Sequence, residues 1–168
     1  MNGKSVTGKS VQTEGDINSV SIAMKITYGS FKYFTGGDLT GGGRGTPDVE
    51  SLIAERVGDV NVMKSDHHGS ATANNSFFLS KLKPENVIVT VGNGGVNKRY
   101  HLPNAETMAR MVSFPFIETI FQTARGEGGR VPASETMKIK NTDGDVIVVA
   151  GQDRYWINNF EIKTNNIP

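Results

Sequence analysis

The chain lacks cysteine altogether, has only three histidines, and carries no large excess of either charge. Without cysteine it forms no disulfide bond and no thiolate metal site, so any bound metal must use His, Asp or Glu side chains. The 18 Lys and Arg residues nearly balance the 17 Asp and Glu residues, which leaves no broad basic field for a nucleic-acid backbone. No apolar run approaches the about 18 to 20 residues of a membrane span, and the first residues show no signal-peptide pattern. These absences predict a soluble protein without a membrane span, with the cytoplasm as the favoured compartment.

The composition predicts one loop-rich domain. A chain of 168 residues can bury a sizeable core, and 36% hydrophobic residues with 20 glycines suit a globular protein. Residues 1–17 are polar and have no period, so we interpret them as a flexible lead-in. Residues 18–168 are predicted to form a single domain, because no repeat, heptad pattern or interior boundary divides them.

Strands and helices alternate in the middle of the chain and give way to hairpins at both ends. Apolar residues alternate over 20–28, which predicts a half-buried strand, and the β-branched run 87–91 predicts a central parallel strand. After a flexible connector at 41–45, Thr46-Pro47-Asp48 has the residues of a helix start, and Gly58 would end that helix. The other predicted elements are strands at 31–34, 60–64, 116–121 and 155–162, a helix capped by Asn75, a helix at 104–113, and a hairpin joining 137–140 to 146–149 through Asp143-Gly144. This order predicts an α/β (α+β) fold, in which helices cover one face of a mixed β-sheet.

The most informative stretch is Asp66-His67-His68-Gly69-Ser70, which follows the predicted strand at 60–64. Histidine is the commonest metal ligand among side chains. An isolated His-His pair is as well explained by one buried hydrogen-bonding ring and one exposed ring. The glycine that follows permits close backbone approach, and Ser70 could orient a ring nitrogen or cap the next segment, so the stretch favours a functional site.

A carboxylate is predicted to lie beside the histidine pair. Asp38 follows Gly36-Gly37 at the end of another predicted strand, where an aspartate taken alone is most often a turn residue. A strand–helix–strand crossover places both strand ends at one edge of the sheet, where ligands bind in open α/β folds. His101 ends the loop after the strand at 87–91 and could reach the same edge, although a surface histidine explains it equally well. A hydrolytic triad of Ser70, His68 and Asp38 is disfavoured, because no nucleophile elbow surrounds the serine.

Several segments in a fixed order carry a family resemblance. They are Asn18-Ser19-Val20-Ser21-Ile22, Tyr33-Phe34-Thr35-Gly36-Gly37-Asp38-Leu39, a helix with Glu50, Val62-Met63-Lys64-Ser65-Asp66-His67-His68-Gly69-Ser70, Leu82-Lys83-Pro84-Glu85-Asn86-Val87, and a Gly/Asn loop ending in Tyr100-His101. The series resembles the metallo-β-lactamase-fold superfamily, and it is most similar to the hydrolase domain of bacterial competence DNA-uptake proteins and its stand-alone relatives. The resemblance covers roughly residues 18–124, and its His-His-Gly-Ser motif is more specific than its Gly-Asp motif.

The resemblance implies an αββα sandwich with one or two metal ions, usually zinc or manganese. Asp38 matches the bridging aspartate, one of His67 and His68 matches a late ligand histidine, and His101 matches a histidine near the site. Members of the family hydrolyse phosphodiesters, lactones, thioesters or β-lactams, and the metal activates water and polarises the bond under attack. The family's His-x-His-x-Asp-His motif is missing from this chain, which therefore resembles the C-terminal half of the sandwich.

Three functions are consistent with these residues. The first is a metal-dependent hydrolase of a phosphodiester or another small molecule, with Asp38 and His68 as catalytic residues and Asp38, His67 and His68 as candidate metal ligands. His101 and Ser70 would then lie near the site. The missing N-terminal half would then supply the other ligands, and the isolated chain is expected to bind zinc or manganese weakly and to hydrolyse little. Because a half sandwich exposes apolar surface of its sheet, self-association is also expected. The second is a non-catalytic domain for protein interaction or DNA-uptake assembly. The third is a DNA-binding accessory domain, which the near-neutral charge disfavours.

Overall fold

A computed structural model describes residues 17–93, 100–127, 137–158 and 160–163. The predicted lead-in, apart from Ile17, and much of the predicted Gly/Asn loop before His101 lie outside the described residues. A 3₁₀ turn, η1 (Ile17–Val20), begins the described chain, and a second, η2 (Asp66–Gly69), contains the histidine pair.

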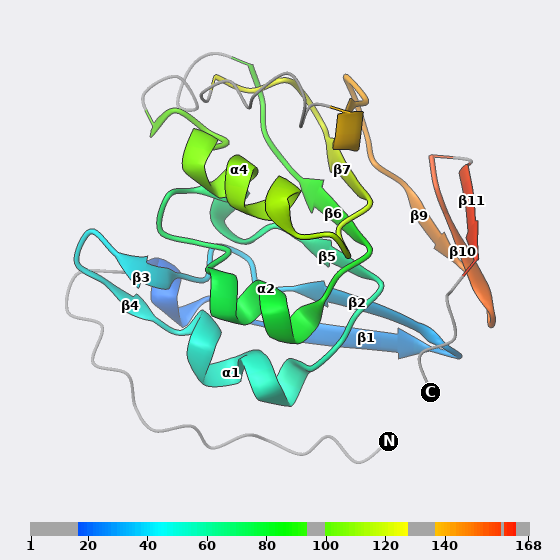
Figure 1. The fold of residues 1–168 in the computed structure, drawn as a ribbon, viewed down its shortest axis with the longest axis horizontal. Coiled ribbons are helices and arrows are strands. Elements are labelled where there is room, and N and C mark those ends of the chain that lie inside the picture. The colour runs from blue at the N-terminus through cyan, green and yellow to red at the C-terminus, as the bar shows by residue number, and fades with distance from the viewer. Residues whose placement is uncertain (1–16, 94–99, 128–136, 159, 164–168) are drawn as a thin grey trace.

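A mixed six-stranded sheet forms the centre of the fold (Figure 1). Its strands lie in the order β1 (Met24–Tyr28), β2 (Phe31–Thr35), β5 (Val62–Lys64), β6 (Asn86–Val89), β7 (Thr119–Gln122) and β8 (Ile139–Asn141). β1 is antiparallel to β2, and every other neighbouring pair is parallel. The predicted α+β class is confirmed, and β6 is the central parallel strand that its Val/Ile run predicts.

Three helices cover one face of this sheet: α1 (Glu50–Val57), α2 (Ser76–Leu82) and α4 (Ala105–Ser113) (Figure 1). The main core lies between the helices and the sheet and includes Phe34, Phe78 and Met111, which are fully buried. The predicted cap of α2 is confirmed, since the Asn75 side chain accepts a hydrogen bond from the Phe78 amide. The Asn104 side chain caps α4 by accepting two hydrogen bonds from its first turn. No helix in the described ranges is both long and apolar enough to cross a membrane.

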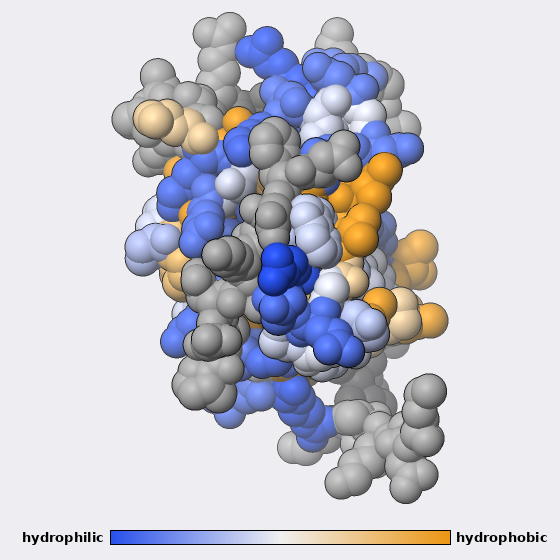
Figure 2. All heavy atoms as spheres, turned by 90° about the vertical axis from the view of Figure 1, so that its right-hand side faces the viewer, coloured by the Kyte–Doolittle hydropathy of each residue, from blue (hydrophilic) through white to orange (hydrophobic). Residues whose placement is uncertain are grey.

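A three-stranded sheet packs against the opposite face of the main sheet. It contains β9 (Val148–Ala150), β10 (Arg154–Ile157) and β11 (Phe160–Lys163). Tyr155 anchors it, because its ring packs 5.0 Å from that of Phe31 and its hydroxyl donates a 2.8 Å hydrogen bond to the Glu85 carboxylate. Figure 2 views the molecule from the side of this sheet and shows hydrophobic residues gathered in one part of a mostly polar surface.

Four predictions of local structure are wrong. Thr46-Pro47-Asp48 is a strand, β4, paired with β3 (Gly41–Gly43), so the expected connector is a hairpin and the helix begins at Glu50. The expected hairpin at 137–149 is absent from the described residues, because β8 joins the main sheet and β9 joins the small one. Residues 155–162 contain parts of two strands, β10 and β11. The start of the predicted strand at 20–28 is not strand, and β1 begins at Met24.

The first strand is exposed on both faces, although its alternation predicts one buried face. Lys25 donates hydrogen bonds to carbonyl groups at the C-terminal end of α1, so the odd-numbered residues face the helices. The even-numbered residues lie on the other face, on the side of Phe31 and Tyr33, where Met24, Ile26 and Tyr28 are exposed. β1 therefore presents an apolar stripe, defined as these last three residues, at the edge of the sheet.

Candidate functional site

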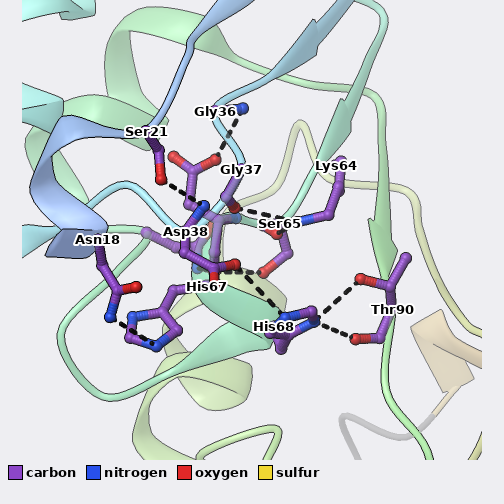
Figure 3. A network of polar contacts seen from close by, with 12 residues as sticks. Asn18, Ser21, Gly36, Gly37, Asp38, Lys64, Ser65, His67, His68 and Thr90 are labelled. Atoms are coloured by element: carbon purple, nitrogen blue, oxygen red, sulfur yellow. Dashed lines mark hydrogen bonds and ion pairs between the residues drawn. The ribbon is translucent and has the colours of Figure 1, made fainter.

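The predicted convergence of Asp38 with the histidine pair is confirmed. β2 leads into Gly36-Gly37-Asp38 and β5 leads into His67-His68, and these two strands are parallel neighbours in the sheet. Asp38 Oδ1 lies 3.4 Å from His68 Nε2 (Figure 3). The backbone joins the same two segments, because the His67 amide donates a 3.0 Å hydrogen bond to the Gly37 carbonyl.

The histidine pair lies in a left-handed turn. His67 and His68 have φ values of 46° and 53°, and Gly69 follows with a φ of 72°. Such angles are uncommon for residues other than glycine and concentrate at functional sites. Glycine is required at position 69 for a second reason, because a Cβ there would lie 2.9 Å from Pro103 Cβ. The Asn104 amide donates a 2.8 Å hydrogen bond to the Gly69 carbonyl, so the segment before α4 supports the turn.

The two imidazole rings point to different sides of this turn (Figure 3). His67 Nε2 lies 3.5 Å from the Asn18 side-chain amide nitrogen. His68 Nδ1 lies 2.7 Å from the Thr90 carbonyl oxygen and 3.2 Å from the Thr90 hydroxyl. The geometry therefore distinguishes two histidines that the sequence leaves equivalent, and only His68 faces Asp38.

The tautomer of His68 follows from its contact with Thr90. A carbonyl oxygen only accepts hydrogen bonds, so His68 Nδ1 carries a proton and donates it. In the neutral ring Nε2 is then an acceptor, and it faces a carboxylate oxygen that is also an acceptor. Two acceptors at this distance need a cation between them, either a proton on Nε2 or a metal ion. A histidine that ligates a metal commonly donates its other ring N–H to a backbone carbonyl in this way.

The spacing of the two acceptors fits a metal ion. Two ligand atoms that each lie about 2.1 Å from a tetrahedral ion are about 3.4 Å apart, which matches the separation of Asp38 Oδ1 and His68 Nε2. The side chains of His68 and Asp38 are 40% and 38% exposed, so an ion at this position would remain accessible to a further ligand.

Lys64 and Ser21 hold the loop that carries Asp38. The Asp38 amide donates a 3.1 Å hydrogen bond to the Ser21 hydroxyl. The Lys64 ammonium donates to the carbonyls of Gly37 and Ser65, at 3.1 and 3.0 Å, and thereby ties the end of β2 to the end of β5 (Figure 3). Burial lowers the pKa of Lys64, while the nearby carboxylates of Asp66 and Asp38 oppose this shift.

A buried carboxyl pair lies behind the histidine turn. Glu50 is fully buried at the start of α1, and its carboxyl oxygens accept hydrogen bonds from the amides of Asn74 and Asn75, at 2.6 and 2.7 Å. Asp66 accepts a 3.1 Å hydrogen bond from the Gly36 amide. Burial raises the pKa of Glu50 to about 7, and burial together with the nearby Glu50 carboxylate raises that of Asp66 well above its usual range. The pair therefore holds a proton that exposed carboxyl groups would release at neutral pH.

The other two residues predicted near the site, Ser70 and His101, make no described contact with Asp38 or His68. The Ser70 hydroxyl lies 3.3 Å from that of Thr72, so Thr90 takes the orienting role that was expected of Ser70. His101 is exposed and adopts a φ of 52° just before Pro103. Among the contacts of the described residues, none joins His101 to Asp38 or His68.

Sequence reasoning did not assign a role to Thr90, Lys64 or Glu50. Thr90 directly follows β6, which is the parallel neighbour of β5, so its position beside the histidine turn was open to inference. Lys64 is a charged residue in an otherwise apolar buried strand, which is also a detectable signal. Glu50 gives no such signal, because an acidic residue in the first turn of a helix is ordinary.

The donor set is smaller than a catalytic zinc site requires. In the part of the chain that the structure describes, no group of three or more His, Cys, Asp or Glu side chains is placed to hold a metal. Asp38 and His68 thus supply two donors, where a catalytic zinc ion usually takes three protein ligands and one open position. Compared with known proteins, the chain matches no protein-family model and no curated protein.

Proposed function

We propose that the chain carries part of the metal site of a hydrolase, with Asp38 and His68 as ligands of a zinc or manganese ion. One observation carries the proposal: His68 Nδ1 is committed to the Thr90 carbonyl, and this leaves Nε2 aimed at the Asp38 carboxylate at a separation that suits two ligands of one ion. A bound ion would lower the pKa of water and polarise an ester bond. The substrate class that fits the family resemblance is a phosphodiester or another small ester.

The protein's own residues would bind the ion and hold its two ligands in a fixed orientation. Asp38 offers a carboxylate from a loop fixed by Ser21 and Lys64, and His68 offers a ring nitrogen whose direction is fixed by Thr90. Rigid presentation matters because a ligand that is already in place loses little conformational freedom on binding. The same site with only two ligands would hold an ion weakly.

The remaining ligands would come from a partner. The apolar stripe of β1 supports this step, because large exposed apolar patches mark interaction sites. Either the other half of a sandwich or a second copy of this chain would fit such a surface, and either would lie next to the site, since β1 is the neighbour of β2.

Metal titration tests the proposal. Calorimetry with Zn²⁺ and Mn²⁺ is expected to give weak binding that Asp38→Asn and His68→Gln each reduce at least about tenfold, since each removes one of two ligands. His101→Gln is the matched control and is expected to bind as the wild type does. Equal binding by the wild type and His68→Gln would refute the assignment of His68. Turnover of bis-p-nitrophenyl phosphate is expected to be low in the isolated chain, and fast turnover lost in Asp38→Ala would show that no partner is needed.

A second candidate function is a non-catalytic interaction domain, and the apolar stripe together with the two-donor site favours it. In that case Ile26→Lys would reduce self-association, measured by light scattering, while Asp38→Asn would have no effect on any measured property except weak metal binding. Thr27→Lys, on the helix-facing side of the same strand, is the matched control. A monomer at all concentrations would contradict association through β1.

A further inference from the structure

The histidine turn is a strained segment that neighbouring groups must hold in place. His67, His68 and Gly69 are consecutive residues with φ values of 46°, 53° and 72°. Left-handed angles cost free energy for residues other than glycine, so such a turn persists only where the surrounding structure fixes it. The end of the turn is fixed from α4, because the Thr107 hydroxyl donates a 2.9 Å hydrogen bond to the Ser70 carbonyl.

The start of the turn is fixed by the side chain of Asn74. Its carbonyl oxygen accepts a 3.1 Å hydrogen bond from the Asp66 amide, and its amide group donates a 3.1 Å hydrogen bond to the Asp66 carbonyl. We name these two hydrogen bonds the Asn74 bracket. Asn74 is fully buried, where polar groups that lose their partners are costly. The bracket therefore holds the backbone of the residue directly before His67.

Two helices in turn hold Asn74. Its amide donates a 2.6 Å hydrogen bond to the Glu50 carboxylate at the start of α1, and its carbonyl accepts a 3.0 Å hydrogen bond from the Arg110 guanidinium on α4. Both backbone polar groups and both side-chain polar groups of Asn74 thus have partners. The helix layer sets the position of Asn74, and Asn74 passes that position on to the histidine turn.

The residue that Asn74 holds also contacts the loop that carries Asp38. The Asp66 carboxylate accepts a 3.1 Å hydrogen bond from the Gly36 amide, two residues before Asp38. Asp66 therefore lies between the segments that supply the two candidate ligands. A displacement of Asp66 would change the separation of Asp38 Oδ1 and His68 Nε2, which is 3.4 Å.

We infer that Asn74 is a positioning residue of the candidate metal site. The Asn74 bracket keeps the left-handed turn in the conformation that directs His68 Nδ1 at the Thr90 carbonyl and His68 Nε2 at Asp38. Asn74 acts through Asp66 and does not itself bind the ion. The inference rests on the proposed function for its effect on metal affinity, but its effect on the His68 ring requires no metal.

The variant Asn74→Gly tests the inference. Asn74 has a φ of 57°, which glycine adopts without strain, so the substitution removes the side chain and leaves the backbone conformation available. Nitrogen-15 spectra of the imidazole rings, recorded on the metal-free full chain at pH 8, report the tautomer. In the wild type we expect His68 to carry its proton on Nδ1, and in Asn74→Gly we expect both ring nitrogens to shift toward the values of exchanging tautomers. Calorimetry with Zn²⁺ is expected to show an affinity at least about tenfold lower, as is typical when a group that orients a ligand is lost.

Tyr155→Phe is the matched control for the loss of buried hydrogen bonds. It removes the contact with Glu85, which precedes β6, whereas Thr90 follows β6, so the lost contact lies at the opposite end of the strand from His68. This variant is expected to keep the tautomer and the zinc affinity of the wild type at a temperature where both variants are folded.

The tautomer of His68 decides the outcome. A folded Asn74→Gly variant that keeps the wild-type tautomer would overturn the inference even if its zinc affinity falls. An equal change in Tyr155→Phe, or a wild type in which His68 already exchanges between tautomers, would overturn it as well. A wild type that binds no zinc, together with a changed tautomer in Asn74→Gly, would refute the metal proposal and support the positioning role.

A second variant decides if Asn74→Gly does not fold. Arg110→Met removes the hydrogen bonds to the carbonyls of Ala73 and Asn74 but leaves the side chain that forms the bracket. It is expected to shift the ring nitrogens of His68 in the same direction by a smaller amount. Wild-type ring signals in folded Arg110→Met would then overturn the inference.

Discussion

Replacement of Glu50 by glutamine should change the pH dependence of folding stability. The Glu50 side chain is fully buried, next to Asp66, and burial raises its pKa from 4.5 to about 7. The folded protein therefore keeps a proton that the unfolded chain releases as the pH rises from 4.5. The contribution of Glu50 to the free energy of unfolding is therefore largest below pH 4.5, and it is lost as the pH rises through 7.

The size of the effect follows from the two pKa values. The difference between 4.5 and about 7, at about 1.4 kcal/mol for each pH unit, gives a loss of about 3 kcal/mol between acidic and alkaline conditions. Glutamine does not titrate, so Glu50→Gln should lose much of this slope. It should also be less stable than the wild type near pH 5, by about 1 to 3 kcal/mol, because its amide accepts fewer hydrogen bonds from the amides of Asn74 and Asn75.

Urea unfolding followed by circular dichroism between pH 5 and pH 8 measures both quantities. Glu55→Gln on the same helix is the matched control, since its side chain is 72% exposed and its removal should leave the slope as it is in the wild type. Comparison with the wild type subtracts the contributions of the histidines and of other carboxyl groups. A Glu50→Gln variant whose stability has the same slope with pH as the wild type would refute the assignment of a buried proton to this carboxyl pair.

Three further substitutions test the packing that holds the site and the small sheet. Gly36→Ala should destabilise the protein by about 1 to 3 kcal/mol, because the new Cβ would lie 2.5 Å from Asp66 Oδ1 in a buried position. Tyr155→Phe should cost about 1 to 3 kcal/mol, because it leaves the half-buried Glu85 carboxylate without its hydroxyl donor. Asn104→Ala should cost about 1 kcal/mol, because it removes the side chain that caps α4. Urea unfolding at fixed pH measures all three.

Each of these substitutions has a control in the same chain. In Gly144→Ala the new Cβ would meet only the Thr142 carbonyl oxygen, at 4.0 Å, so this change should cost less than Gly36→Ala. Tyr28→Phe removes a hydroxyl from an exposed ring and should be nearly neutral. Asn104→Asp retains a capping oxygen, so its stability should stay close to that of the wild type. If a control destabilises as much as its partner, the corresponding contact is not the cause.

The sequence was sufficient to predict an element of the fold where one physical signal dominated. The Val/Ile run of β6 predicts a buried parallel strand, and the Asn75 cap predicts the start of α2, and both are confirmed. The meeting of Asp38 with the histidine pair was also predictable, since parallel strand topology alone brings the ends of β2 and β5 together.

Prediction failed where one signal serves two structures. Thr46-Pro47-Asp48 suits a helix start, yet here it pairs with Gly41–Gly43 in a hairpin. The Pro47 carbonyl accepts a hydrogen bond from the Thr40 hydroxyl, and Asp48 accepts one from the Ser51 amide at the true start of the helix. These contacts involve residues outside the three-residue pattern Thr46-Pro47-Asp48, so the pattern by itself could not reveal them.

Within the site, the sequence left His67 and His68 equivalent. What separates them is the left-handed turn and the carbonyl of Thr90, and both depend on the finished backbone rather than on residue type. The burial of Glu50 is of the same kind, because it depends on the approach of Asn74 and Asn75 from a distant segment.

The partner of His68 belongs to the main chain, and this has a consequence for how the site tolerates mutation. Any residue at position 90 that keeps β6 and its neighbouring backbone in place supplies the same carbonyl oxygen. Genetic drift at this position would therefore leave the imidazole correctly aimed, whereas a shift of β6 relative to β5 by one residue would misdirect it without any change in the histidine itself.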